Sequence, residues 1–197
     1  MTPQQSLLFS IIHLTTFCLY IAKYAGLRKG QRYAGPEKAP VEAMPLARRI
    51  TKLAFVTSSL LVLLGFWTGE ARYGYLQAPL WLRAGGVGLT LGAFLFLSRA
   101  LDQLGKNYSP LFDTHRPFFI VDSGPYKYIR HPVYLCNILI ISGYVLSSAS
   151  LAVLMLSLWG WGYMLRSVMR EEAFLAGAFP EYLEYQKRTW RIVPYVY

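Results

Sequence analysis

The sequence predicts an all-α integral membrane protein with five transmembrane helices, the last two forming a hairpin. Three observations support this prediction. The chain of 197 residues is 54% hydrophobic and only 15% charged, whereas a soluble domain carries about 25% charged residues. Long apolar segments recur along it, and Lys and Arg, which outnumber Asp and Glu by 20 to 10, lie almost entirely between them. The length suits a single membrane domain over residues 1–197.

The first three predicted spans are residues 7–22, 53–69 and 80–97. No basic region or cleavage site of a secretory signal precedes the first segment, so it is expected to remain a membrane span. His13 within it is expected to face the bundle and to be hydrogen-bonded. Arg83 lies near one end of the third span, from where its side chain is expected to snorkel to the interface. The third span contains Gly85, Gly86, Gly88 and Gly92, with a small-xxx-small pair at Gly88 and Gly92, and these glycines predict close packing between helices.

The fourth and fifth spans share one tract without charged residues, residues 132–165. A single helix through this tract would be roughly 51 Å long, against a hydrocarbon core of roughly 30 Å. We therefore predict two short spans joined by a turn at Ser147-Ser148-Ala149-Ser150.

The distribution of basic residues supports the count of five. With loops alternating between the two sides, all of the 20 Lys and Arg residues except Arg72 and Arg83 fall on one side. The positive-inside rule then predicts an N-terminus outside and a C-terminus in the cytoplasm, in an inner membrane or an ER-type membrane. Because apolar runs separate the basic residues, they indicate contact with anionic lipid headgroups and argue against a nucleic-acid partner.

Two blocks of functional residue types flank the hairpin on the predicted cytoplasmic side. In the first block, Ser123-Gly124-Pro125 is typical of a turn, and Pro132 suits the first turn of a helix. His131 and Tyr134 then lie one turn apart. In the second block, Arg166, Arg170 and Glu171 occupy the last turns of the fifth span, and the hairpin should bring them beside His131.

Residues 179–185 predict a short amphipathic helix that forms a cytoplasmic C-terminal cap. Its Tyr182, Leu183 and Tyr185 are expected to lie across the mouth of the hairpin as a lid. A purely structural interpretation of both blocks is a network of salt bridges with an aromatic belt at the membrane interface. No metal-ligand spacing is present in the sequence.

From residue 104 to residue 194 the chain resembles the isoprenylcysteine carboxyl methyltransferase family, whose wider relatives include the phospholipid N-methyltransferases. The resemblance lies in Ser123-Gly124-Pro125-Tyr126, Arg130-His131-Pro132-Val133-Tyr134, Arg170-Glu171-Glu172, Phe179-Pro180, Tyr182, Tyr185 and Arg191…Pro194. It implies a pocket for S-adenosylmethionine between the cytoplasmic ends of spans four and five. The residues that match the family's cofactor motif are Phe118, Phe119, Ile120, Val121, Tyr126, His131, Pro132, Val133, Tyr134 and Glu171.

The resemblance also implies a substrate-facing arginine about four residues before the cofactor glutamate. In this chain Ser167 holds that position, and Arg166 and Arg170 flank it, so either arginine is a candidate. A carboxylate acceptor would need only such an arginine. An amine, thiol or phenol would need deprotonation, for which His131, Glu172 and Tyr134 are the candidates.

The function implied is methyl transfer to a lipophilic acceptor that partitions into the membrane, such as a lipid or a prenylcysteine-type carboxylate. Residues 1–101 would form the substrate side, and residues 102–197 the cofactor loop, hairpin and lid. Two other classes stay open: a nicotinamide-dependent membrane reductase of related fold, and a non-enzymatic scaffold or transporter subunit. S-adenosylhomocysteine should stabilise only the methyltransferase.

Overall fold

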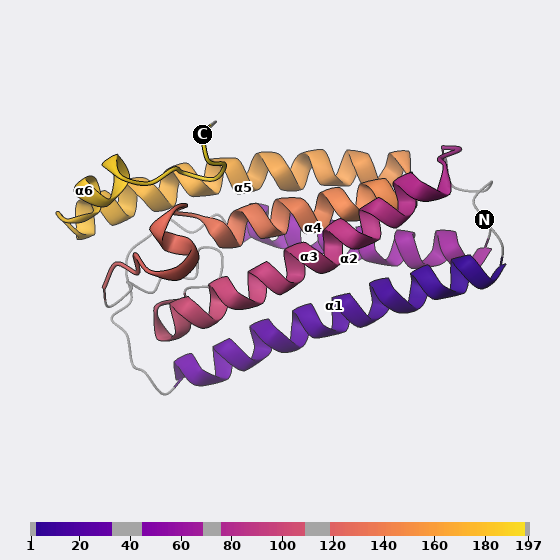
Figure 1. Ribbon diagram of the computed structural model, residues 1–197, viewed down its shortest axis with the longest axis horizontal. Helices are drawn as coiled ribbons and strands as arrows, with labels where there is room; N and C mark the ends of the chain where they lie inside the picture. Colours follow the sequence, from indigo (N-terminus) through magenta and orange to yellow (C-terminus); the bar gives the residue numbers. More distant parts are fainter. Residues whose placement is uncertain (1–2, 33–44, 69–75, 109–118, 196–197) are drawn as a thin grey trace.

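The computed structural model describes residues 3–32, 45–68, 76–108 and 119–195. Its helices are α1 (Pro3–Arg32), α2 (Pro45–Thr68), α3 (Leu80–Leu104), η2 (Gly105–Asn107), η3 (Gly124–Lys127), α4 (Pro132–Ser148), α5 (Leu151–Ala178) and α6 (Tyr182–Lys187). The long helices α1 to α5 pack along one another as an elongated bundle (Figure 1). The start of α4 and the short helix α6 lie at the same end of this bundle, away from the N-terminus (Figure 1).

Three segments within these helices are long and apolar enough to cross a membrane: Leu7–Leu27, Leu80–Leu104 and Leu151–Ala178. Helix α4 is also apolar but shorter, at 17 residues. Large apolar side chains such as Trp81 and Leu95 are exposed on the outside of the bundle, as contact with lipid requires. The predicted all-α membrane fold is confirmed at this level.

The predicted hairpin turn between α4 and α5 is confirmed. Helix α4 ends at Ser148, Ala149 adopts a left-handed conformation with φ 52° and ψ 34°, and α5 begins at Leu151. The amide of Ala149 donates to the carbonyl of Val145 at 2.9 Å, which closes the last turn of α4. Ser150 caps α5, because its hydroxyl accepts from the amide of Val153 at 3.4 Å.

Arg83 does not snorkel to the interface; this prediction was wrong. Its side chain is only 1% exposed, and its guanidinium donates to the carbonyls of Ser147 at 3.3 Å and Ser148 at 3.2 Å. The last carbonyls of a helix have no partner within the helix and carry partial negative charge, so a cation there is stabilising. Arg83 therefore ties α3 to the hairpin turn.

The close helix packing predicted from the glycines of the third span is confirmed at Gly86, but not at the Gly88 and Gly92 pair. A Cβ added at either position would meet nothing within 4 Å. The close approach lies instead between Gly86 of α3 and Gly143 of α4, where an added Cβ would come within 2.6 Å and 2.2 Å of atoms of the other helix. The absence of side chains at this pair allows the two backbones to pack tightly.

His13 confirms the expectation of a buried, hydrogen-bonded side chain. It is 3% exposed, and its ring nitrogens lie 2.8 Å from the carbonyl of Phe9 and 2.8 Å from the hydroxyl of Ser147. Together with Arg83 it fixes the hairpin turn at one end of the bundle. The other end, where α4 begins, is the one that carries the two functional blocks.

Candidate functional site

The first block enters the site through the short helix η3. Ser123 precedes it in an extended conformation, and Pro125 lies in its first turn. The side chain of Tyr126 is buried, and its hydroxyl donates to the carbonyl of Ala100 at the end of α3, at 3.4 Å. His131 then occupies the N-cap position of α4, and Pro132 follows at its first helical position. The turn chemistry expected here is thereby confirmed.

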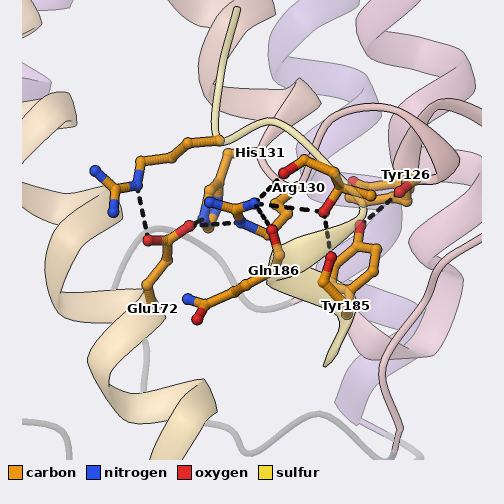
Figure 2. Close-up of polar contacts among 8 residues, drawn as sticks. Tyr126, Arg130, His131, Glu172, Tyr185 and Gln186 are labelled. Carbon is orange, nitrogen blue, oxygen red and sulfur yellow. Dashed lines mark hydrogen bonds and ion pairs between the residues drawn. The ribbon is translucent and has the colours of Figure 1, made fainter. Parts of the chain in front are cut away.

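The second block meets the first through Glu172. This residue of α5 is buried, and Figure 2 shows its carboxylate turned toward Arg130 and His131. Its Oε1 accepts from Nε of Arg130 at 2.7 Å, and its Oε2 accepts from Nε of Arg191 at 2.7 Å. The Nε2 of His131 lies 3.4 Å from Oε1. The carboxylate is thus surrounded by three basic side chains from two distant parts of the chain.

The C-terminal segment is held along the backbone that leads into α4. The amide of Arg130 donates to the carbonyl of Trp190 at 2.8 Å, and the amide of His131 donates to that of Arg191 at 3.1 Å. The guanidinium of Arg130 also donates to the carbonyl oxygens of Gln186 and Thr189 (Figure 2). The backbone of Arg130 and His131 is therefore fixed to the C-terminal segment at the entrance to α4.

Helix α6 covers this end of the bundle. Tyr182 and Tyr185 are buried with Phe179, and Ile120 packs against them. The hydroxyl of Tyr185 donates to the carbonyl of Tyr126 at 2.6 Å, which joins α6 to η3 (Figure 2). The predicted short helix is confirmed, whereas Leu183, expected in the lid, is 51% exposed and faces outward.

Glu171 has a different environment from its neighbour Glu172. It is half-buried, interacts with the hydroxyl of Tyr134, and contributes its charge to the surroundings of Tyr126 and Tyr182. Among the residues described, the salt bridges of α5 involve Glu172 and not Glu171. A carboxylate that faces phenols has acceptor positions for a cationic or hydroxyl-bearing ligand.

The phenols outside the membrane-spanning segments remain protonated. Burial is the main cause that raises the pKa of Tyr126, Tyr182 and Tyr185 above its ordinary value. The negative charge of Glu171 raises the pKa of Tyr126 and Tyr182 further. These hydroxyl groups are therefore hydrogen-bond donors throughout the neutral pH range.

The structure brings together five of the residues that the sequence singled out: Tyr126, His131, Tyr134, Glu171 and Glu172. The rings of His131 and Tyr134 meet edge to face, with centroids 5.6 Å apart. Of the preceding segment, Ile120 and Val121 are half-buried, Phe119 is 60% exposed, and Phe118 lies outside the described residues. Pro132 is buried, and Val133 packs against the core between α3 and α4.

The two candidate substrate arginines stand apart from this cluster. Arg166 is exposed and Arg170 is half-buried. At about 100° per residue, Arg170 projects from α5 roughly 100° away from Glu171 and roughly 160° away from Glu172. Neither arginine can share one face of α5 with both carboxylates.

Arg130 and Arg191 were not among the predicted site residues, yet they hold Glu172. The sequence did carry a signal, because Arg130 and Arg191 each lie in one of the motifs and a third motif contains the adjacent carboxylates Glu171 and Glu172. Which carboxylate they would choose depends on the rotation of α5, and spacing along the chain does not give that rotation.

Three comparisons with known proteins each find matches to this chain. Residues 81–182 match the model of a family described as phospholipid methyltransferase. The cobalt-zinc-cadmium resistance protein CzcN of Cupriavidus metallidurans is 37% identical over 144 residues, which cover 72% of this chain and 60% of that protein. The nickel-cobalt-cadmium resistance protein NccN of Alcaligenes xylosoxydans xylosoxydans is 28% identical over 159 residues, which cover 79% of this chain and 69% of that protein.

A solved structure also resembles this chain, the eukaryotic intramembrane Ras methyltransferase ICMT, an isoprenylcysteine carboxyl methyltransferase. The match has a TM-score of 0.57 and 20% sequence identity, and it covers 74% of this chain and 52% of that chain. The chain therefore spans about half the length of the solved protein. At this level of identity the likeness concerns the fold.

Proposed function

The chain belongs to the phospholipid methyltransferase family, and this confirms the prediction from its resemblance to the isoprenylcysteine carboxyl methyltransferases. We propose that it transfers a methyl group from S-adenosylmethionine to a lipophilic acceptor in the membrane. One observation carries this proposal. Glu171, three phenols and the His131 imidazole gather at the end of a bundle of apolar helices. A polar cofactor and a lipid acceptor would both reach that position.

The chemistry of the cluster suits this cofactor. S-adenosylmethionine carries an ammonium, a carboxylate, ribose hydroxyls and an adenine ring. We assign Glu171 to the ammonium or the ribose hydroxyls, because its carboxylate interacts with the phenol of Tyr134 and forms no salt bridge with another described residue. His131 would meet the carboxylate of the cofactor, and the rings of Tyr126 and Tyr134 would offer flat surfaces to the adenine. Residues 119–121, Pro132 and Val133 complete the proposed pocket.

The bound cofactor would supply a methyl group on a sulfonium, which leaves without needing a proton. The protein's own task is therefore to align the acceptor with that methyl group and to exclude water. Burial of His131, Tyr134 and Glu172 favours such exclusion. For an acceptor that must lose a proton, His131 is the candidate base, since both oxygens of Glu172 are already paired with arginines and the hydroxyl of Tyr134 interacts with Glu171. We assign Glu172 to positioning His131.

We infer the chemical class of the acceptor from the apolar side chains exposed on the outside of the bundle. The exposed apolar side chains of α1, α3 and α5 present a surface that fits lipid. We propose an acceptor that enters between helices from the bilayer, as a lipid or a prenylated molecule would. If its reactive group is a carboxylate, Arg166 or Arg170 at the headgroup level would attract it.

We further propose that α1 to α5 all cross the membrane, with the N-terminus outside and the site and α6 in the cytoplasm. Helix α5 has 28 residues and is therefore about 42 Å long, which exceeds a hydrocarbon core of about 30 Å. Its last turns, with Arg166, Arg170 and the two carboxylates, would then project into the headgroup region. The positive-inside rule favours the cytoplasm for this end.

Calorimetric titration of the detergent-purified protein with S-adenosylhomocysteine tests the proposal. The wild type should bind, and Glu171→Ala should weaken binding by about tenfold or more, since a hydrogen bond to a charged group contributes about 1.5–3 kcal/mol. Glu184→Ala is the matched control, because Glu184 is exposed and pairs with Lys187 on α6. Equal binding by Glu171→Ala and the wild type would contradict the proposal. A response to NADPH alone would indicate a reductase, and no response to either would indicate a scaffold.

A further inference from the structure

The hydroxyl of Tyr182 stands out among the buried polar groups of the cap. Tyr182 begins α6, and its side chain is 1% exposed. Its ring packs against that of Tyr185, with centroids 5.8 Å apart, and its amide donates to the carbonyl of Phe179 at 3.0 Å. The ring and backbone of Tyr182 are thus fixed in place.

The phenolic oxygen itself is buried and has no hydrogen-bond partner among the residues that the structure describes. Its neighbour Tyr185 differs, because that hydroxyl donates to the carbonyl of Tyr126 at 2.6 Å. Phenylalanine in place of tyrosine would fill the same volume without burying an unpaired donor. A buried hydroxyl without a hydrogen-bond partner destabilises the ligand-free protein. Its presence is explained if a bound ligand supplies the acceptor.

The surroundings of this hydroxyl are those of the proposed cofactor pocket. It lies within electrostatic range of Glu172, Glu171 and Arg130. Burial, followed by the charges of the two carboxylates, raises the pKa of Tyr182 above its ordinary value, so the hydroxyl is a donor and not an anion. Tyr182 belongs to α6, which lies at the end of the bundle where α4 begins (Figure 1).

We propose that Tyr182 is a cofactor-binding residue, whose hydroxyl donates a hydrogen bond to an acceptor atom of the bound S-adenosyl cofactor. This assignment rests on the proposed function and adds a contact from α6 to those of the hairpin. Binding of the cofactor would then be coupled to the closed position of the cap, because the same helix provides the donor and covers the site.

The test compares Tyr182→Phe with Tyr185→Phe in the full-length protein purified in detergent. Both changes remove only a hydroxyl, and both residues lie on the same short helix. For each variant, the melting temperature without ligand and the dissociation constant for S-adenosylhomocysteine are measured. Tyr182→Phe should leave the melting temperature unchanged or raise it, and it should weaken binding by about tenfold, the effect of one net hydrogen bond.

Tyr185→Phe should behave in the opposite way, with a lower melting temperature before ligand is added, because its hydroxyl bonds within the protein. If Tyr182→Phe binds S-adenosylhomocysteine as the wild type does, the assignment is wrong. A melting temperature as low as that of Tyr185→Phe would also overturn it, since the hydroxyl would then have a partner in the protein. Failure of the wild type to bind would refute the proposed function itself, and the assignment with it.

Discussion

Removal of the Glu172 carboxylate should destabilise the end of the bundle that carries the site. This carboxylate pairs with Arg130 and Arg191, both at 2.7 Å. The side chains of Glu172 and Arg130 are 5% and 8% exposed, whereas that of Arg191 is 30% exposed. Glu172→Ala therefore leaves one buried guanidinium without a carboxylate and one that water can partly solvate.

The magnitude follows from this difference in burial. Breaking a buried ion pair by removing one partner costs about 3–5 kcal/mol, and the partly exposed pair adds about 0–1 kcal/mol. For a chain of this size, about 2–4 °C of melting temperature corresponds to each kcal/mol. We expect Glu172→Ala to lower the melting temperature by about 10 °C.

Thermal unfolding in detergent, followed by near-UV circular dichroism, measures this loss. Glu172→Gln keeps the volume of the side chain and should lose less, because its amide oxygen can still accept from one arginine. Glu184→Ala should change the melting temperature little, since its pair with Lys187 is exposed on both sides. If Glu172→Ala melted within about 2 °C of the wild type, the reasoning from burial would be refuted.

Three further predictions concern packing, the hairpin turn and pH. Gly143→Ala should lower the melting temperature or prevent folding, because its Cβ would clash with α3. Gly88→Ala has open space around its Cβ position and should be tolerated. Equal effects of the two changes would contradict the contact between Gly86 and Gly143. Arg83→Leu should lower the melting temperature, because it leaves the carbonyls of the hairpin turn without a donor. Arg99→Leu, at an exposed position, should leave the melting temperature unchanged. Burial raises the pKa of Tyr185, so its contribution to stability is complete below about pH 10 and is lost as the pH rises further. The melting temperature should therefore fall above pH 10, and Tyr185→Phe should flatten that fall.

The helices could be predicted from the sequence because apolar length is a local property. The uncharged tract over residues 132–165 is too long for one span and contains one serine-rich interruption, so its turn could be predicted within a few residues. The meeting of His131 with the end of α5 then follows from the return of the chain. These inferences need only the lengths of helices and the positions of charges.

Rotation of helices about their axes could not be predicted in the same way. Gly86 and Gly88 lie in the same glycine-rich stretch, but only Gly86 faces α4. Arg83 would snorkel on an isolated helix, yet the carbonyls of the hairpin turn, distant in sequence, provide it with buried acceptors. The choice of Glu172 over Glu171 by Arg130 and Arg191 depends likewise on which face α5 presents.

The most direct test of the central claim is methyl transfer itself. Membranes that contain the wild-type protein would be incubated with S-adenosylmethionine labelled with tritium in its methyl group, and the lipid and protein extracts counted. We predict label in a lipophilic product with the wild type, and background counts with Glu171→Ala expressed to the same level. Equal labelling by both, or none above membranes without the protein, would contradict the assignment of this cluster to methyl transfer.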